Sequence, residues 1–269
     1  SFYLGRRLHS KIVVVDAKIA LIGGINIANK YQGTTTEKAW LDYAVQLKGE
    51  VAKPLKQLCS DIYLKKRKLR DKKLRFIFGM QQDTSIRILQ NDWLKGKDQI
   101  CDSYIHSIRN AKKEIIIVGS YFLPGIRIIQ ALKKASKNKV AIKLILSGKS
   151  DLPLTRRATC FLYEKLLKYN IELYEWDESV LHGKVAVIDG KWSTIGSFNL
   201  NNLSSYGSLE TNVEINSESF SIMFREHLNE IILQCHNITL ESLKAKNSVM
   251  TKFINLISYG ITRIIEILI

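Results

Sequence analysis

The chain contains two closely similar stretches: LHSKIVVVD, Leu8–Asp16, returns as LHGKVAVID, Leu181–Asp189. The likeness continues further along, where LIGGIN, Leu21–Asn26, corresponds to TIGSFN, Thr194–Asn199. Both copies follow the pattern H-x-K-x4-D-x6-G-[GS]-x-N, so the chain carries an internal repeat. Because the recurring residues are polar types with little packing reason to recur, the duplication predicts a shared chemical role.

In each copy the histidine and the lysine share one face of a predicted strand. Side chains alternate between the two faces of a strand, so His9 and Lys11 point the same way. The same holds for His182 and Lys184. A nucleophile or base is therefore expected beside a cation in each copy.

The motif aspartates, Asp16 and Asp189, fall in predicted tight turns, and we expect them to be turn residues rather than catalysts. Folding the chain back at these turns brings Asn26 toward the first histidine. The second turn likewise brings Ser197 and Asn199 toward the second histidine. Spacing alone thereby gathers a nucleophile or base, a cation, small-residue backbone and an amide into one cluster per copy.

Composition limits the class of partner. The 269 residues include 41 Lys and Arg against 25 Asp and Glu, a formal charge of +16, and 46% are hydrophobic. This balance is typical of a core-forming protein rather than a disordered one, and its basic excess predicts nucleic acid, phospholipid headgroups or a phosphorylated small molecule as partner. The four cysteines form no C-x-x-C pair and suggest neither a zinc site nor a disulfide framework. No apolar run approaches the ~20 residues that cross a bilayer.

Strands alternate with amphipathic helices between residues 86 and 216. The expected elements are helix 100–108, strand 115–118, helix 128–135, strand 140–146, helix 155–169, and strands 171–174, 185–188, 194–195 and 212–215. Such alternation predicts βαβ units. We therefore expect an α/β fold in which each repeat is a mixed, mostly parallel sheet flanked by helices.

The chain divides into four expected parts. They are the C-terminal part of a first repeat (1–52), a basic helix or linker (53–85), a second repeat (86–236) and a C-terminal amphipathic helix (237–269). Residues 53–75 hold ten Lys or Arg against two Asp. A charge run of this kind is typical of a solvated helix face, with a phosphate-contacting patch as the alternative.

The first repeat has only eight residues before His9, whereas the second has a long βαβα portion between Ile86 and His182. We expect the first repeat to be N-terminally incomplete, with roughly 100 more residues encoded upstream by analogy with the second. The hairpin Leu8–Ile25 would then show an apolar face and an unpaired edge. Residues 1–269 alone are accordingly expected to be poorly soluble or inactive.

The duplicated motif closely resembles the signature of the phospholipase D superfamily, over essentially the whole chain. Within the superfamily the nearest likeness is to bacterial cardiolipin synthases. That likeness also rests on Trp40-Leu41-Asp42, Ser120–Pro124 and Asn199–Ser204. The duplicated motif is highly specific for the superfamily and much less specific for the substrate.

The resemblance implies a two-step exchange at a phosphodiester. One histidine attacks phosphorus to give a phosphohistidine, and the other protonates the leaving alkoxide and then deprotonates the incoming alcohol or water. Family precedent makes His9 the nucleophile and His182 the general acid and base, although the copies are nearly symmetric. The implied phosphate-binding groups are Lys11, Lys184, Asn26, Ser197 and Asn199. The resemblance implies no metal and no cofactor. In the first copy Gly24 replaces the serine, so a backbone N–H would have to supply the missing donor.

Each histidine is expected to have an orienting carboxylate, because a partner on the second ring nitrogen fixes the tautomer. Matching to the family selects Glu210 for the second copy, 28 residues past His182. For the first copy it selects Asp42. The alternative there is Glu37, which lies 28 residues past His9.

The favoured function is phosphatidyl transfer that forms cardiolipin from phosphatidylglycerol. Hydrolysis of phospholipid or of nucleic acid by the same histidines is the alternative, and the intact motifs disfavour a catalytically silent binding protein. The expected partner is anionic phospholipid at the cytoplasmic face of the bacterial cell membrane, with no obligate protein partner evident. From Phe253 onward apolar residues recur at helical spacing, and this helix either packs on the domain or lies at a membrane interface.

Overall fold

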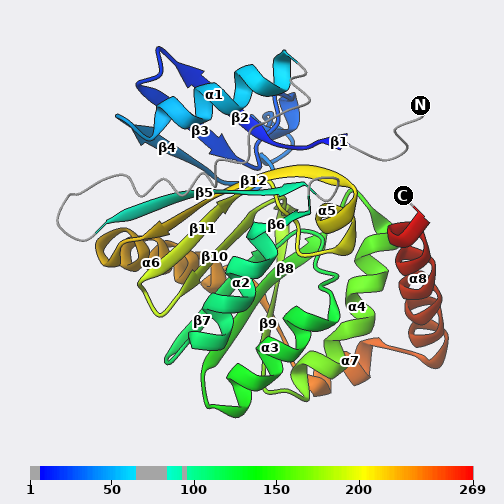
Figure 1. Cartoon of the computed structure of the whole chain (residues 1–269). Helices are drawn as coiled ribbons and strands as arrows, with labels where there is room; N and C mark the ends of the chain where they lie inside the picture. The colour runs from blue at the N-terminus through cyan, green and yellow to red at the C-terminus, as the bar shows by residue number, and fades with distance from the viewer. Residues whose placement is uncertain (1–6, 65–83, 93–95, 269) are drawn as a thin grey trace.

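The computed structural model describes residues 7–64, 84–92 and 96–268 (Figure 1). The strands are β1 (Arg7–Leu8), β2 (Lys11–Val15), β3 (Ile19–Gly23), β4 (Ala44–Lys48), β5 (Ser85–Asp92), β6 (Lys97–Asp98), β7 (Glu114–Gly119), β8 (Ala141–Lys149), β9 (Glu172–Val180), β10 (Lys184–Ile188), β11 (Trp192–Gly196), β12 (Ser208–Asn216) and β13 (His236–Ile238). The helices are η1 (Asn29–Tyr31), α1 (Ala52–Tyr63), α2 (Gln99–Asn110), α3 (Ile126–Lys137), α4 (Pro153–Leu167), α5 (Asn202–Tyr206), α6 (Glu218–Leu233), α7 (Leu240–Lys246) and α8 (Val249–Leu268). Every helix and strand expected between residues 100 and 216 is present.

A ten-stranded sheet runs in the order β13-β9-β8-β7-β10-β11-β12-β5-β6, with β1 beside β12. β7, β8 and β9 are parallel and are joined through α3 and α4. β10, β11, β12 and β5 are antiparallel neighbours. The expected mixed α/β class is confirmed, but the expected excess of parallel pairs is wrong for the described strands. A tight turn joins β10 to β11, and such a turn can join only antiparallel strands.

Both faces of the large sheet are covered. One core lies between the sheet and α2, α3 and α4, and includes Ile117 and Leu144. A second core lies on the opposite face, where Val185 packs with Phe224 and Leu228 of α6. Because β10 and β11 are buried along their whole length, they show no apolar and polar alternation.

The first motif belongs to a small antiparallel sheet, in the order β2-β3-β4. Its inner face packs through Ile22 and Leu47 on α1 and on Val213 of β12. Its outer face leaves Val13 and Leu21 exposed. Among the described strands β2 pairs only with β3, whereas β10, its counterpart in the second copy, pairs with both β11 and β7.

The two motif hairpins turn in the same way. Asp16 and Ala17 have φ of 51° and 53°, and Asp189 and Gly190 have φ of 55° and 62°. Two successive positive φ values define the tight turn that suits a twisted hairpin. The Asp189 carboxylate also accepts hydrogen bonds from the backbone N–H groups of residues 112–114, at 2.7 to 2.9 Å. Both motif aspartates are therefore located in turns.

The C-terminal part contains more elements than the single helix expected, and the basic segment is described only at its start. Helix α1 covers the start of the basic segment, and its remainder, residues 65–83, lies outside the described residues. The C-terminal part contains β13, α7 and α8 rather than one helix. In the described part of the chain, no helix is both long enough and apolar enough to cross a membrane.

Candidate active site

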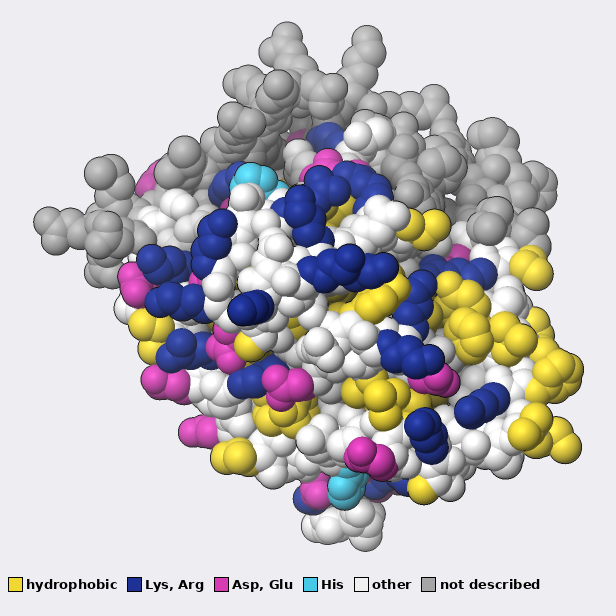
Figure 2. Space-filling view, turned by 90° about the horizontal axis from the view of Figure 1, so that it is seen from below, with side chains coloured by type: hydrophobic (Ala, Val, Ile, Leu, Met, Phe, Trp, Pro, Cys, Tyr) yellow, Lys and Arg dark blue, Asp and Glu magenta, His cyan; other side chains and the backbone are white. Residues whose placement is uncertain are grey.

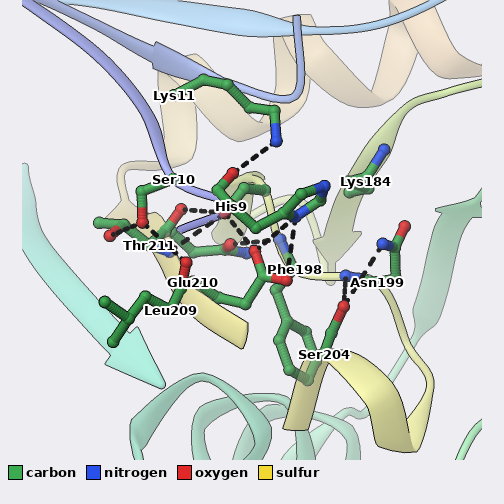
Figure 3. Close-up of polar contacts among 12 residues, drawn as sticks. His9, Ser10, Lys11, Lys184, Phe198, Asn199, Ser204, Leu209, Glu210 and Thr211 are labelled. Carbon is green, nitrogen blue, oxygen red and sulfur yellow. Dashed lines mark hydrogen bonds and ion pairs between the residues drawn. The ribbon is translucent and has the colours of Figure 1, made fainter. Parts of the chain in front are cut away.

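The first motif is held against the second repeat by backbone hydrogen bonds. β1 pairs in parallel with the start of β12, which sets Leu8 opposite Leu209. The N–H of His9 then donates to the Leu209 carbonyl at 3.0 Å, and the Ser10 hydroxyl donates to the same carbonyl at 3.1 Å. Because Glu210 follows Leu209 on β12, its carboxylate reaches the imidazole of His9 (Figure 3).

The second motif is held by the first repeat in the same manner. Leu41 forms a parallel bridge with Leu181. The N–H of Leu41 donates to the Val180 carbonyl at 2.9 Å, and the N–H of His182 donates to the Leu41 carbonyl at 2.8 Å. Because Asp42 follows Leu41, its carboxylate reaches the imidazole of His182.

Each imidazole therefore binds the carboxylate of the other repeat. Nδ1 of His9 lies 2.9 Å from Oε2 of Glu210, and Nδ1 of His182 lies 2.7 Å from Oδ2 of Asp42. The expected pairing of each histidine with the carboxylate of its own copy is wrong. The alternative Glu37 lies exposed on a loop, where its N–H donates to a threonine hydroxyl. Since a carboxylate only accepts, each Nδ1 carries the proton, and neither Nε2 has a hydrogen-bond partner among the residues that the structure describes.

The two carboxylates are held by different donors. The Ser197 hydroxyl donates to Glu210 and accepts from the N–H of Thr211. Asp42 instead accepts from the N–H of Tyr43 at 2.7 Å. The hydrogen of Ser197 is thus engaged with a buried carboxylate, which does not fit the expected donation to a phosphate.

Gly24, the counterpart of Ser197, has a steric reason to be glycine. A Cβ added at Gly24 would lie 2.4 Å from Oδ1 of Asp42, far inside contact distance. The shorter aspartate side chain occupies the space that a serine would need. The backbone N–H that replaces the missing hydroxyl comes from Tyr43 and serves the carboxylate.

The two motif lysines lie in similar surroundings and interact with the charges of both motifs. Nζ of Lys11 donates to the carbonyl of His9 at 2.5 Å, and Nζ of Lys184 donates to the carbonyl of His182. Burial lowers the pKa of each lysine to about 8. Glu210 and Asp42 oppose that shift at both lysines, which shows that the charges of the two motifs act on one another.

His182 has further polar contacts that the motif does not contain. The Tyr31 hydroxyl lies 3.0 Å from its Nδ1, and the Asn26 amide donates to that hydroxyl at 2.8 Å. Asn26 therefore reaches the site through Tyr31 rather than directly. Burial lowers the pKa of His182, while its bond to Asp42 acts in the opposite direction. Tyr31 was missed because its place in η1 gives no pattern that distinguishes it from an ordinary loop residue.

Three aromatic rings surround the imidazole of His182. The ring centroids of Tyr31 and Trp40 each lie 5.7 Å from it, and that of Tyr121 lies 6.0 Å away. These rings explain the burial of His182, whereas the side chain of His9 keeps 30% of its surface exposed. The two imidazoles thus differ in access although their hydrogen bonds correspond.

Asn199 is held by hydrogen bonds within the second repeat. It is buried, its amide oxygen accepts from the Ser120 hydroxyl at 3.2 Å, and its amide nitrogen donates to the Ser204 hydroxyl at 3.4 Å. In Figure 3 it lies near Lys184. The fold thus gathers the histidines, lysines, carboxylates and asparagines of the motifs in one region. Ser197 is engaged with Glu210, and both motif aspartates lie in turns.

The site has balanced charge before any ligand enters. Two ammonium groups face two carboxylates, and a proton on His182 would add one positive charge. A bound phosphodiester anion would be balanced by that proton. Within the described ranges, no three His, Cys, Asp or Glu side chains come together as metal ligands.

The chain is similar to known proteins in sequence and in fold. Residues 104–232 match the family described as "Cardiolipin synthase, PLD-like domain". Among solved structures, the phosphatidylserine synthase of Haemophilus influenzae superposes with a TM-score of 0.71 at 14% identity, over 96% of this chain and 69% of that one. The phospholipase D family member Nuc from Salmonella typhimurium gives 0.50 at 20% identity, over 58% of this chain and 99% of that one. Residues 104–232 therefore match a PLD-like domain, and the chain shares its fold with these two solved structures.

Cardiolipin synthases are among the curated proteins that the chain matches. The chain is 36% identical over 231 residues to cardiolipin synthase B of Shigella flexneri and of Escherichia coli K12, covering 84% of this chain and 56% of each relative. It is 28% identical over 259 residues to the minor cardiolipin synthase of Bacillus subtilis, covering 91% of this chain and 61% of that relative. The chain therefore spans little more than half the length of these relatives.

Proposed function

We propose that the protein transfers a phosphatidyl group between two phosphatidylglycerol molecules, forming cardiolipin and releasing glycerol. The observation that carries the proposal is the crossed pair of imidazoles, His9 on Glu210 and His182 on Asp42, with the half-buried Lys11 beside the first and the buried Lys184 beside the second. This arrangement leaves two Nε2 atoms, without a partner among the described residues, and two cations around a site for one phosphodiester. The cardiolipin synthases among the relatives support the choice of lipid.

In the first step, Nε2 of His9 attacks phosphorus. A nitrogen–phosphorus bond forms, the bond from phosphorus to the glycerol oxygen breaks, and His182 gives its proton to that oxygen. Glu210 accepts from Nδ1–H of His9 and stabilises the positive charge that develops on the ring. Burial disfavours a proton on His182 in the free protein. The anionic phosphodiester acts in the opposite direction, so substrate binding favours the protonated acid.

In the second step, a hydroxyl of another phosphatidylglycerol takes the place of the released glycerol. His182 accepts its proton, the oxygen attacks phosphorus, and the nitrogen–phosphorus bond breaks to restore His9. Lys11 and Lys184 stabilise the charge on the phosphoryl oxygens in both steps, and Asn199 can donate its amide hydrogen to them. Water in place of the alcohol would give hydrolysis, so access to the site determines which product forms.

The basic charge of +16 supports an anionic phospholipid surface as the place of work. We place the protein peripherally at the cytoplasmic face of the bacterial cell membrane. Each surface Lys or Arg close to such a membrane adds ~1 kcal/mol to binding. High salt should weaken that contribution.

The test is to incubate the full-length gene product with labelled phosphatidylglycerol, phosphatidylcholine or single-stranded DNA, with and without a chelator, and to separate the products. Cardiolipin and glycerol from phosphatidylglycerol, unaffected by the chelator, are expected. Phosphatidic acid alone, DNA cleavage without lipid turnover, or strict dependence on an added divalent metal would overturn the proposal.

The role of each histidine is tested by trapping the intermediate and mapping it by mass spectrometry. A phosphohistidine at His9 is expected, and His182→Asn should slow both its formation and its breakdown. His9→Asn should remove the label. A label on His182 would reverse the two roles.

A further inference from the structure

Helix α8 buries its polar side and exposes its apolar side, the reverse of an ordinary surface helix. Its buried residues are polar: Asn255, Ser258, Thr262 and Glu266 are only 4% to 7% exposed. Its outward residues are large and apolar, with 39% to 86% of their surface exposed: Val249, Met250, Phe253, Leu256, Ile257, Ile261, Ile264 and Ile265. A helix that only packs on a soluble domain places these faces the other way round.

Specific contacts fix this orientation. The ring of Tyr259 lies 4.8 Å from that of Phe161 on α4. Arg263 bonds to Glu266 at 2.9 Å and donates to the carbonyls of Leu123 and Pro124 at 3.1 and 2.8 Å. Because the polar side makes these contacts, rotating α8 to bury its apolar face would break them all.

The outward side of α8 forms an apolar patch with a basic rim. Figure 2 shows apolar side chains gathered along the edge of the molecule where Figure 1 places α8. At the start of the helix, Lys244 and Lys252 are exposed and Nζ of Lys168 lies 2.6 Å from the Glu164 carboxylate, whose pKa the three lysines lower. This cluster has three cations for one anion. The exposed face itself carries no acidic residue among the described side chains.

We propose that the outward face of α8 docks the protein on an anionic lipid surface, with its apolar side chains at the boundary between headgroups and acyl chains. An amphipathic helix with a basic rim binds such interfaces through buried apolar area and attraction to anionic lipid. A second copy is the poorer occupant, because its own basic rim would meet this one. The inference rests on the proposed function, which supplies a lipid substrate.

The docked helix is also connected to the active site. Arg263 holds the Leu123 and Pro124 carbonyls in the turn that follows Tyr121, and the Tyr121 ring contacts His182. A membrane bound to α8 would therefore lie on the same side of the molecule as the turn that carries Tyr121 to His182. Docking would set the height of the active site above the membrane.

The test compares variants of the full-length gene product on vesicles of phosphatidylcholine with and without phosphatidylglycerol. The double variant Ile257→Asn with Ile261→Asn should sediment with anionic vesicles about tenfold less, or weaker still, because two side chains lose their burial in the interface. The matched control is Met223→Asn with Leu233→Asn, which changes two exposed apolar residues of α6 and should bind as the unchanged protein does.

Depth is measured separately with nitroxide-labelled acyl chains. A tryptophan introduced as Phe253→Trp should be quenched by them, and one introduced as Leu233→Trp should not. Unchanged vesicle binding by the α8 double variant, or no quenching at Phe253→Trp, would overturn the inference. Loss of a dimer in that variant, with vesicle binding unaltered, would assign the face to a second copy and overturn it as well.

A short-chain phosphatidylglycerol below its critical micelle concentration separates this inference from the proposed function. The α8 double variant should keep its rate on that dispersed substrate and lose it on vesicles. If the unchanged protein binds vesicles through α8 yet makes no cardiolipin from either substrate, the docking stands and the proposed function fails.

Discussion

Replacing Lys184 by methionine should stabilise the fold at neutral pH while abolishing activity. Lys184 is 2% exposed, and burial lowers its pKa from 10.5 to about 8. A shift of that size means that keeping the ammonium charged inside the protein costs on the order of 3 kcal/mol. Methionine has a similar length and no charge, and the hydrogen bond lost to the His182 carbonyl costs ~1 kcal/mol. The free energy of unfolding should therefore rise by about 2 kcal/mol.

The gain should depend on pH with a definite sign. Because the pKa of Lys184 is lower in the folded protein than in the unfolded chain, the unfolded chain binds more protons between pH 8 and pH 10.5. The free energy of unfolding of the unchanged protein should rise through that interval as the buried charge disappears. The advantage of the variant should be full below pH 8 and should shrink toward pH 10.5.

The measurement is urea unfolding of both proteins at pH 7 and near pH 10, with Lys191→Met as the control. Lys191 is exposed in the same hairpin, so its replacement should change neither stability nor the pH dependence. If Lys184→Met lowers the free energy of unfolding at pH 7 while the control leaves it unchanged, the buried ammonium stabilises the fold and the reasoning fails.

Three further predictions address the site. Asp42→Asn should lower the pKa of His182 further and slow the reaction ~10–150-fold, the equivalent of losing a charge-assisted hydrogen bond. Glu210→Gln should leave the NMR titration of His182 unchanged. If only Glu210→Gln shifts that titration, each histidine is paired with the carboxylate of its own copy and the crossed pairing is wrong. Gly24→Ser should displace the Asp42 carboxylate and reproduce the effect of Asp42→Asn on that titration, because its Cβ would lie 2.4 Å from Oδ1; an unchanged titration would count against this. The rate on phosphatidylglycerol should fall as pH rises above about 8, where both motif lysines lose charge, and a rate that stays level to pH 10 would remove them from the phosphate site.

The sequence determines the parts of the site that depend on short spacing. His9 and Lys11 lie two residues apart, so strand alternation sets them on one side wherever the strand is placed. Asp189 and Gly190 reverse the chain because they accept positive φ, and this brings the segment with Ser197 back beside β10. Such features follow from bond geometry and local conformation, and the structure adds only their final bounds.

The carboxylate partners could not be assigned from spacing. Glu210 meets His9 because β1 pairs with β12, and Asp42 meets His182 because Leu41 bridges Leu181. These contacts join residues far apart in the sequence. A count of residues from each histidine cannot reveal which distant strand lies beside it.

The direction in which α8 faces was also decided by tertiary structure alone. The periodicity after Phe253 shows that the helix has an apolar and a polar side, and it is the same whichever side meets the protein. The contacts of Arg263 with the Leu123 and Pro124 carbonyls draw the polar side inward and leave the apolar side exposed. A pattern along one helix states how its side chains divide between two faces. Which face is covered depends on the hydrogen-bonding groups and volume that a distant part of the chain presents to it.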